Sequence, residues 1–219
     1  MKLSKETLTI LASFANINGN LVIRPGNKLM TGAVARNIMA SVTVNETFDS
    51  IFGIYDLKEL LGVIGLFSDP DLTFSENELT ITEGKTCIKY GAAEVDVLIS
   101  PKKLPPFPEH PEVQFALNAE TLNRITKSAA ILKVPFVTVH GDGSSMEIRV
   151  HDKSNPNSNS FRVDLGETDK TFDFHFKHEI LKMLPGDYEV SLCKQKTARF
   201  IGKNSVYYLT CELDSTFSE

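Results

Sequence analysis

Two histidines three residues apart give the strongest hint of site chemistry in the sequence, and the hint is weak. His175 and His178 could begin a metal site, but they span a predicted strand-to-helix junction and no third ligand lies nearby. Asp142-Gly143 and Asp69-Pro-Asp71 are turn signals, so we do not expect catalysis there. The chain has no GxSxG, Walker or HExxH motif. We therefore predict no enzymatic activity, no catalytic residue, no cofactor and no metal.

The three cysteines do not suggest a disulfide framework or a zinc site. Cys87, Cys193 and Cys211 are odd in number and widely separated in the sequence, whereas both kinds of site need closely paired spacings. Their neighbours are β-branched or aromatic. We predict that all three are buried free thiols in a reducing compartment.

Composition places limits on the class of protein. Hydrophobic residues make up 42% of the 219, which is ordinary for a soluble globular chain with a sizeable core. No apolar run approaches the roughly 18 residues of a membrane span, and the first 19 residues have the pattern of an amphipathic helix instead of a signal peptide. The net charge is −5, which disfavours a protein that grips nucleic acid by neutralising phosphates.

A proline-rich segment divides the chain. Residues 100–111 hold five of the ten prolines, and proline lacks the amide donor that helices and inner strands require. This predicts an N-terminal domain over residues 1–100, a linker over 101–111 and a C-terminal domain over 112–219.

Helix and strand patterns recur about every 60 residues. Each of four units begins with a predicted helix, near Ser4, Asp56, Asn118 and Lys177, and continues with short strands of apolar alternation. We therefore predict the α+β class, with four pseudo-repeats arranged as two similar domains, each of two helices on antiparallel sheets. The predicted strands are 21–24, 28–31, 38–44, 51–55, 72–74, 78–82, 86–90, 113–117, 136–140, 146–151, 172–176, 188–193, 198–201 and 206–213.

The predicted helices are basic although the chain is acidic. Segments 2–6, 56–59, 118–133 and 177–184 contain eight basic and five acidic residues, so the rest of the chain carries −8. Charged faces are common on exposed helices and need not have a function. Four equivalent helices on one side of two sheets would nevertheless form one shared basic surface, suited to loose, sequence-independent contact with phosphates.

The chain resembles the sliding clamps, or DNA polymerase accessory proteins, of T-even-type tailed bacteriophages. The resemblance covers essentially the whole length, and its strength comes from the order and spacing of several short motifs. These motifs are Met1-Lys-Leu-Ser-Lys5, Ile54-Tyr-Asp-Leu57 with Leu61-Gly-Val-Ile64, Pro106-Phe-Pro108, Met183-Leu-Pro-Gly-Asp-Tyr188 and Glu212-Leu-Asp-Ser-Thr216.

The resemblance implies a function and its partners. Three subunits would join head to tail into a homotrimeric ring that encircles duplex DNA, with the helices lining the hole. An ATP-driven clamp loader would place the ring on DNA, and it would tether the replicative DNA polymerase for processive synthesis in the host cell cytoplasm, without a membrane. Late transcription factors would be further partners, because clamps of this type also activate late transcription.

Three sets of residues are predicted to serve this ring. The DNA-facing residues are Lys5, Lys58, Arg124, Lys127 and Lys182, with Lys2 and His178 as weaker candidates. The subunit contact is expected between two edge strands, one over 95–99 and one over 160–165, through Val95, Val97, Ile99, Phe161 and Val163.

The proline-flanked side chains of Leu104 and Phe107 have two interpretations. They either rim a pocket for a partner's peptide, or Phe107 simply fastens the linker to a domain. An alternative function for the whole chain is a virion structural protein that builds rings or tubes from a subunit with tandem domains.

Overall fold

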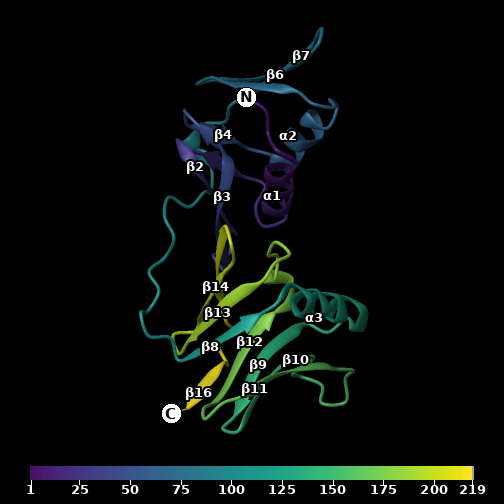
Figure 1. Ribbon diagram of the computed structural model, residues 1–219, viewed down its shortest axis with the longest axis vertical. Coiled ribbons are helices and arrows are strands. Elements are labelled where there is room, and N and C mark those ends of the chain that lie inside the picture. Colours follow the sequence, from purple (N-terminus) through teal and green to yellow (C-terminus); the bar gives the residue numbers. More distant parts are fainter. Residues whose placement is uncertain (219) are drawn as a thin grey trace. The chain divides into compact units, whose positions relative to one another are not determined.

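The computed structural model describes residues 1–218 and divides into two compact units, Met1–Leu104 and Pro105–Glu219. Each unit combines α-helix with antiparallel sheet (Figure 1). The α+β class predicted from the sequence is therefore confirmed.

Two helices pack against each other in the first unit. Helix α1 spans Lys5–Ala15 and begins at Ser4, whose side chain accepts a hydrogen bond from the backbone of Thr7. Helix α2 spans Leu57–Ile64, and Asp56 caps it by accepting from the amides of Lys58 and Glu59. These caps satisfy amides that would otherwise lack partners in the first turn. The buried apolar faces of α1 and α2 meet, which fixes their exposed faces toward solvent.

The strands of the first unit form short antiparallel groups. Strands β1 (Leu21–Ile23) and β4 (Phe52–Ile54) pair with each other. Strand β2 (Gly26–Gly32) pairs with β3 (Ile38–Phe48). A separate three-stranded sheet has the order β5-β6-β7, in which β7 is an edge strand. Its strands are β5 (Asp71–Phe74), β6 (Glu78–Glu83) and β7 (Thr86–Gly91).

The second unit contains a five-stranded antiparallel sheet in the order β11-β10-β9-β12-β16. Strands β15, β14, β13 and β8 pair in that order elsewhere in the unit. The bounds are β8 (Val113–Leu117), β9 (Phe136–Asp142), β10 (Ser145–His151), β11 (Phe161–Glu167), β12 (Thr171–Lys177), β13 (Tyr188–Cys193), β14 (Thr197–Ile201), β15 (Ser205–Thr210) and β16 (Thr216–Ser218).

Helix α3, Ala119–Leu132, covers one face of the five-stranded sheet (Figure 1). Asn118 caps it by accepting from the amide of Thr121 at 2.8 Å. Phe172, Phe174 and Phe176 of β12 are fully buried, whereas the alternate side chains of this strand lie on the opposite face. The sheet therefore has a buried face under α3 and a polar face on its other side.

The predicted fourth helix is wrong, and the four-fold pseudo-repeat is not confirmed. Only His178–Ile180 form a short 3₁₀ turn, so residues 1–218 contain three α-helices. The hydroxyl of Tyr207 binds the amide of Leu184 at 3.1 Å, and the hydroxyl of Tyr188 donates to the Leu184 carbonyl at 2.6 Å. These side chains take the backbone bonds that another helical turn would have used.

Candidate functional site

Lys5 and Lys58 lie on the exposed sides of the two helices of the first unit. Lys5 is the first residue of α1, and the buried positions of that helix include Thr7, Ile10 and Phe14. Lys58 is the second residue of α2, between the buried Leu57 and Leu60 in sequence. Both side chains are solvent-exposed, as the periodicity predicted.

Arg124 and Lys127 are exposed on α3, away from its buried residues Leu122 and Ile125. A guanidinium nitrogen of Arg124 lies 2.6 Å from a carboxylate oxygen of Glu120, one turn earlier in the helix. Both partners are well exposed, so this pair contributes little to stability and remains available to exchange for another anion. The ammonium group of Lys127 is therefore more available to an external anion than the guanidinium group of Arg124.

The remaining basic candidates are not on α-helices. Lys182 is exposed in the segment that follows the 3₁₀ turn, and His178 is an exposed residue of that turn. Lys2 precedes α1, and its ammonium forms an ion pair with Asp69.

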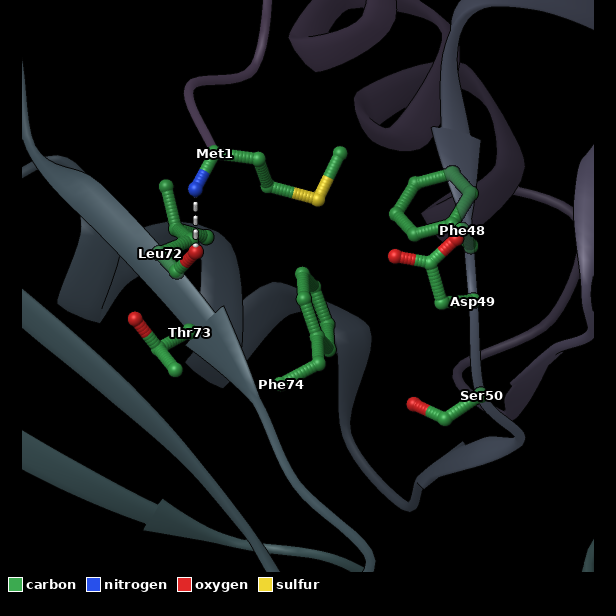
Figure 2. Close-up of a pocket in the computed structure, with 7 residues that line it drawn as sticks. All are labelled: Met1, Phe48, Asp49, Ser50, Leu72, Thr73 and Phe74. Atoms are coloured by element: carbon green, nitrogen blue, oxygen red, sulfur yellow. Dashed lines mark hydrogen bonds between the residues drawn. The ribbon is translucent and has the colours of Figure 1, made fainter.

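A hollow of about 210 Å³ lies beside Met1 in the first unit (Figure 2). The amino nitrogen of Met1 donates to the carbonyl of Leu72 at 2.7 Å, and the amide of Leu72 donates back to the carbonyl of Met1 at 2.7 Å. The Met1 side chain points between the rings of Phe48 and Phe74 (Figure 2). These bonds hold the segment before α1 against β5.

Phe107 packs on the second unit. Its ring meets the ring of Tyr208 edge to face, with centroids 5.8 Å apart, and the guanidinium carbon of Arg199 lies 4.3 Å from its centroid. Phe107 and Leu104 are both half-buried. The contacts provide a physical basis for fastening the linker, and the role of Leu104 and Phe107 in a peptide pocket stays a prediction.

The predicted edge strand over residues 95–99 is wrong. Val95–Val97 form a 3₁₀ turn, and the side chains of Val97 and Ile99 are exposed. The side-chain amide of Asn18 donates to the carbonyl of Ile99 at 2.7 Å, and the side-chain oxygen of Asn20 accepts from the amide of Ile99 at 3.2 Å. Asparagine side chains therefore make the hydrogen bonds to this backbone that a neighbouring strand would otherwise make. The apolar alternation alone could not reveal those asparagine contacts.

Each unit does present an edge strand. Among the described residues, β7 of the first unit pairs with β6 alone, and β11 of the second unit pairs with β10 alone. Phe161 and Val163 are half-buried on β11, and β11 is a sheet edge, as the family resemblance implied for residues 160–165. Their role in a subunit contact stays a prediction. In the first unit β5 and β7 are the two edges of the three-stranded sheet, and β7 lies one element earlier in the chain than the predicted edge.

The cysteines differ in exposure. Cys193 and Cys211 are buried, and burial raises their pKa values to about 11 and about 12, which keeps both as unreactive thiols at neutral pH. Cys87 is exposed, contrary to the prediction, because it lies on the edge strand β7. All three are free.

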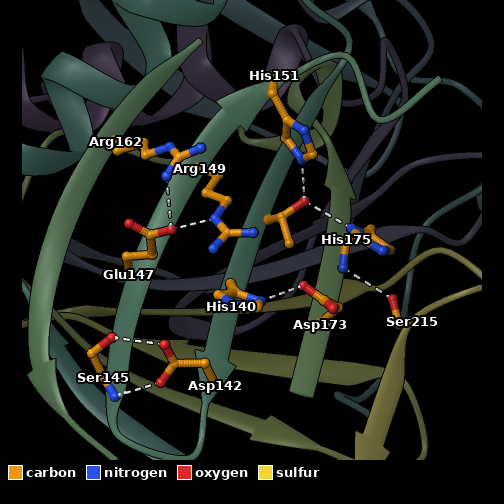
Figure 3. A network of polar contacts seen from close by, with 11 residues as sticks. His140, Asp142, Ser145, Glu147, Arg149, His151, Arg162, Asp173, His175 and Ser215 are labelled. Atoms are coloured by element: carbon orange, nitrogen blue, oxygen red, sulfur yellow. Dashed lines mark hydrogen bonds and ion pairs between the residues drawn. The ribbon is translucent and has the colours of Figure 1, made fainter. Parts of the chain in front are cut away.

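Three histidines lie on the polar face of the five-stranded sheet (Figure 3). The hydroxyl of Thr138 bridges His151 Nε2 at 2.9 Å and His175 Nδ1 at 2.7 Å. His140 Nδ1 lies 2.9 Å from a carboxylate oxygen of Asp173. Burial is the main cause that lowers the pKa values of His151 and His175 below the ordinary range, so both are neutral at neutral pH. Alternation of polar and apolar residues along β9, β10 and β12 could have suggested this network.

The polar network explains His175 without a metal. Its Nδ1 contacts Thr138, and its backbone amide donates to the hydroxyl of Ser215 at 3.0 Å. Within residues 1–218, no cluster of three or more histidine, cysteine, aspartate or glutamate side chains has the geometry to hold a metal ion. The helices in the same range are all too short or too polar to cross a membrane.

Both halves of the chain match known families. Residues 4–100 match the DNA polymerase processivity factor family, and residues 114–213 match the C-terminal domain of the gp45 sliding clamp. The sliding clamp of Enterobacteria phage T4 is 30% identical, and the match covers 99% of each chain. The chain belongs to the sliding-clamp family. The sliding clamp of Vibrio phage KVP40 is 29% identical over 97% of this clamp and 99% of its relative.

Solved structures agree with this fold. PCNA from A. fulgidus, solved with the C-terminal region of FEN-1, has a TM-score of 0.69 at 15% identity, covering 99% of this clamp and all of that chain. The Helicobacter pylori beta clamp, solved with a DNA ligase peptide, has a TM-score of 0.64 at 14% identity, covering 100% of this clamp and 68% of that chain. The resemblance to T-even-type phage clamps is confirmed by the phage relatives, and processivity factors of this kind are accessory proteins without catalysis.

Proposed function

We propose that three copies of this chain close a ring around duplex DNA and tether the replicative DNA polymerase to it, while catalysing no reaction themselves. Membership of the sliding-clamp family carries the proposal. The two edge strands give it a means of assembly, because each unit of the chain ends a sheet with unpaired backbone groups. A head-to-tail contact between two unlike surfaces produces a closed ring when the rotations between successive subunits add up to a full turn.

The subunit contact joins β7 of one copy to β11 of the next. Tyr90 of β7 donates its hydroxyl to the carbonyl of Asp56 at the start of α2, so this side of β7 is the helix side. Val163 of β11 lies opposite the buried Ile148, and α3 packs against β11 on the same side. Pairing the two edges would extend one sheet across the boundary with both helix sides on the same face.

The side-chain pattern selects a register for this contact. An antiparallel alignment that places Tyr90 opposite Val163 also places Ile88 opposite Leu165, and all four side chains are half-buried. The same alignment sets Lys89 opposite Asp164 on the other face, where both are exposed. Apolar cross-strand pairs and an opposite-charge pair each stabilise an antiparallel contact. Val163 and Phe161 keep the interface role predicted for them, whereas β7 takes the place of residues 95–99.

The helix sides of the ring would face the DNA. Lys5, Lys58, Arg124 and Lys127 supply positive charge from exposed helix positions, and Lys182 adds to it from the segment after the 3₁₀ turn. Each exposed charge is screened by salt and contributes little alone. The ring therefore holds DNA by enclosing it and slides because no single contact is strong.

Partners would take turns on one apolar site per subunit, rimmed by Leu104 and Phe107. The replicative polymerase, the ATP-driven clamp loader and late transcription factors are the proposed partners. Two structural neighbours have been solved with a segment of another protein bound, the C-terminal region of FEN-1 in one case and a DNA ligase peptide in the other. A half-buried aromatic ring beside an arginine is a suitable anchor point for such a peptide.

Native mass spectrometry and release from circular DNA test the proposal together. We expect a trimer of three times 24.3 kDa, weak binding to short linear duplex, and persistence on closed circular DNA after loading until the circle is cut. Net negative charge predicts the weak linear binding, because few phosphates can be neutralised. Tight, salt-resistant binding of the unloaded protein to a short linear duplex would contradict the ring.

A further inference from the structure

A polar hollow of about 200 Å³ lies at the end of β10 and β11 in the second unit. Arg149 and His151 of β10, Arg162 of β11, and Ser158 and Ser160 of the connecting segment all line it. Figure 3 shows the two arginines and His151 together on the polar face of the sheet, opposite α3. Every one of these side chains can donate a hydrogen bond or carry positive charge.

The two arginines occupy positions that need a counter-anion. Arg149 and Arg162 are direct cross-strand partners, and like charges in that relation destabilise a sheet. Within residues 1–218 the carboxylate that pairs with both is that of Glu147: its Oε1 binds Arg149 Nε and is 3.8 Å from Arg162 Nη1 (Figure 3). One carboxylate oxygen thus serves two guanidinium groups, and most of their N–H donors remain available.

The other groups around the hollow favour an anion with several acceptors. Ser158 Oγ accepts from the amide of Asp152 at 3.3 Å, which leaves its hydroxyl proton able to donate. His151 uses Nε2 toward Thr138, so Nδ1 remains for a ligand. Asp152 also lines the hollow and opposes an anion, but its Oδ1 accepts from the amide of Ser154 at 2.9 Å. A phosphate group offers the tetrahedral set of acceptors that two guanidinium groups and hydroxyls can share.

We propose that this hollow binds a phosphate group, held by Arg149 and Arg162 and contacted by His151, Ser158 and Ser160. The site is separate from the exposed helix faces and from the linker, so it adds a ligand to the clamp that the encircled DNA does not supply. A free phosphate ion and a phosphate monoester share this chemistry, and the monoester is the larger of the two.

A bound anion would change the protonation of His151. The titratable and charged groups that act on this imidazole are His175 and Asp173 from β12, Arg149 from its own strand, and Asp152. Burial is the largest cause of its lowered pKa, followed by His175 and Arg149. An anion in the hollow stabilises the imidazolium, so the pKa of His151 rises when the site is filled.

NMR of the histidine side chains tests the site on the full-length native assembly. Inorganic phosphate should shift the His151 resonances saturably, and phenyl phosphate should do the same if monoesters enter. Sulfate, which does not titrate in this range, should raise the pKa of His151, whereas sodium chloride at equal ionic strength should not. Arg162→Gln should weaken phosphate binding at least tenfold, and Arg36→Gln in the first unit should leave it unchanged.

Several results would overturn the proposal. One is a His151 shift that grows linearly with salt, or equally with chloride, because it would indicate general screening. Another is undiminished phosphate binding in Arg162→Gln, which would place the anion elsewhere. The sulfate measurement uses the unaltered protein, so it decides the question even if Arg162→Gln disturbs the sheet. Ring formation is measured separately, and its failure would leave this test intact.

Discussion

At the scale of single residues, aromatic and polar contacts organise the second unit. Phe107 lies against Tyr208 and Arg199, and Thr138 joins two imidazoles through one hydroxyl. A hydroxyl has one proton to donate, so the Thr138 bridge works when one histidine accepts and the other donates. A substitution of one side chain, Phe107 or Thr138, should therefore disrupt the contacts around it.

Phe107→Ala tests the proposed partner pocket. We expect the affinity for the proposed partner peptide of the polymerase to fall at least tenfold while the trimer persists, because a central aromatic anchor commonly contributes about 2 kcal/mol or more. The loss of unfolding free energy should stay below the roughly 3–5 kcal/mol of a fully buried phenylalanine, since the ring is half-buried. Calorimetric titration and urea unfolding measure the two effects.

Phe217→Ala is a matched control, because this half-buried ring lies on β16. It should leave peptide affinity unchanged. If Phe107→Ala lowers stability by several kcal/mol with full affinity, Phe107 only fastens the linker and the peptide binds another surface.

His151 and His175 should make folding stability depend on pH. Their pKa values are lowered in the folded state, chiefly by burial, whereas in the unfolded chain they return to about 6.5. The unfolded state therefore binds more protons below about pH 6.5, and the unfolding free energy should fall as the pH drops from 7 to 5.

Urea unfolding at several pH values checks this in buffers free of phosphate and sulfate. His151→Gln/His175→Gln should flatten the dependence, whereas His110→Gln, at an exposed linker position, should not. An identical slope in the double variant and the parent would assign the pH dependence to other groups.

At the scale of elements, hydrogen bonds between side chains and the backbone decided where the sequence patterns ended. Residues 95–99 alternate like a strand, yet Asn18 and Asn20 bind their backbone and a 3₁₀ turn results. Residues 177–184 have helical spacing, yet Tyr188 and Tyr207 take the backbone bonds of Leu184. The first correction changes the proposed assembly, because the edge strand β7 takes the place of residues 95–99 in the subunit contact.

A charge swap tests the β7–β11 contact. Lys89→Glu and Asp164→Lys should each weaken the trimer by about 0.2–1 kcal/mol per contact, because each places like charges opposite one another. The double variant restores opposite charges and should recover part of the loss. Sedimentation equilibrium at low and high salt measures this, with a smaller effect expected at high salt.

Each single substitution can also remove contacts within its own subunit, so the parent, both single variants and the double variant must all be measured as a double-mutant cycle. Lys89 also pairs with Glu78 at 2.9 Å, and Asp164 accepts from the amide of Gly166 at 2.8 Å. Only the coupling between the two substitutions reports the contact itself. Strictly additive losses in the double variant would place Lys89 and Asp164 apart in the ring.

At the scale of the whole molecule, charge is distributed unevenly along an acidic chain. The net charge is −5, yet exposed positions on α1, α2 and α3 carry lysine and arginine. Such a protein would be repelled by DNA over most of its surface and repelled least at the exposed faces of these helices. That combination suits an enclosing ring better than a protein that binds by contact alone.

Arg124→Glu/Lys127→Glu should impair loading and processive synthesis while leaving the trimer intact. The reversal changes the charge of α3 by four units per subunit, and both side chains are exposed, so folding should be little affected. Primer extension on circular template with loader and polymerase measures processivity.

Lys28→Glu/Lys203→Glu is the control for an equal change of net charge, since both lysines are exposed and lie outside the helices. Reduced processivity in the control as well would mean that net charge matters and the α3 face does not. Unchanged processivity in both variants would return Arg124 and Lys127 to an ordinary solvated face.

The sequence by itself determined the α+β class, the three α-helices and nearly every strand. These follow from local causes: caps at Ser4, Asp56 and Asn118, apolar periodicity and proline in residues 100–111. Tertiary structure decided the 3₁₀ turns at 95–97 and 178–180, the exposure of Cys87 and the pairing of Arg149 with Arg162. Those features depend on strand pairing and side-chain contacts that exist only once the sheets have formed.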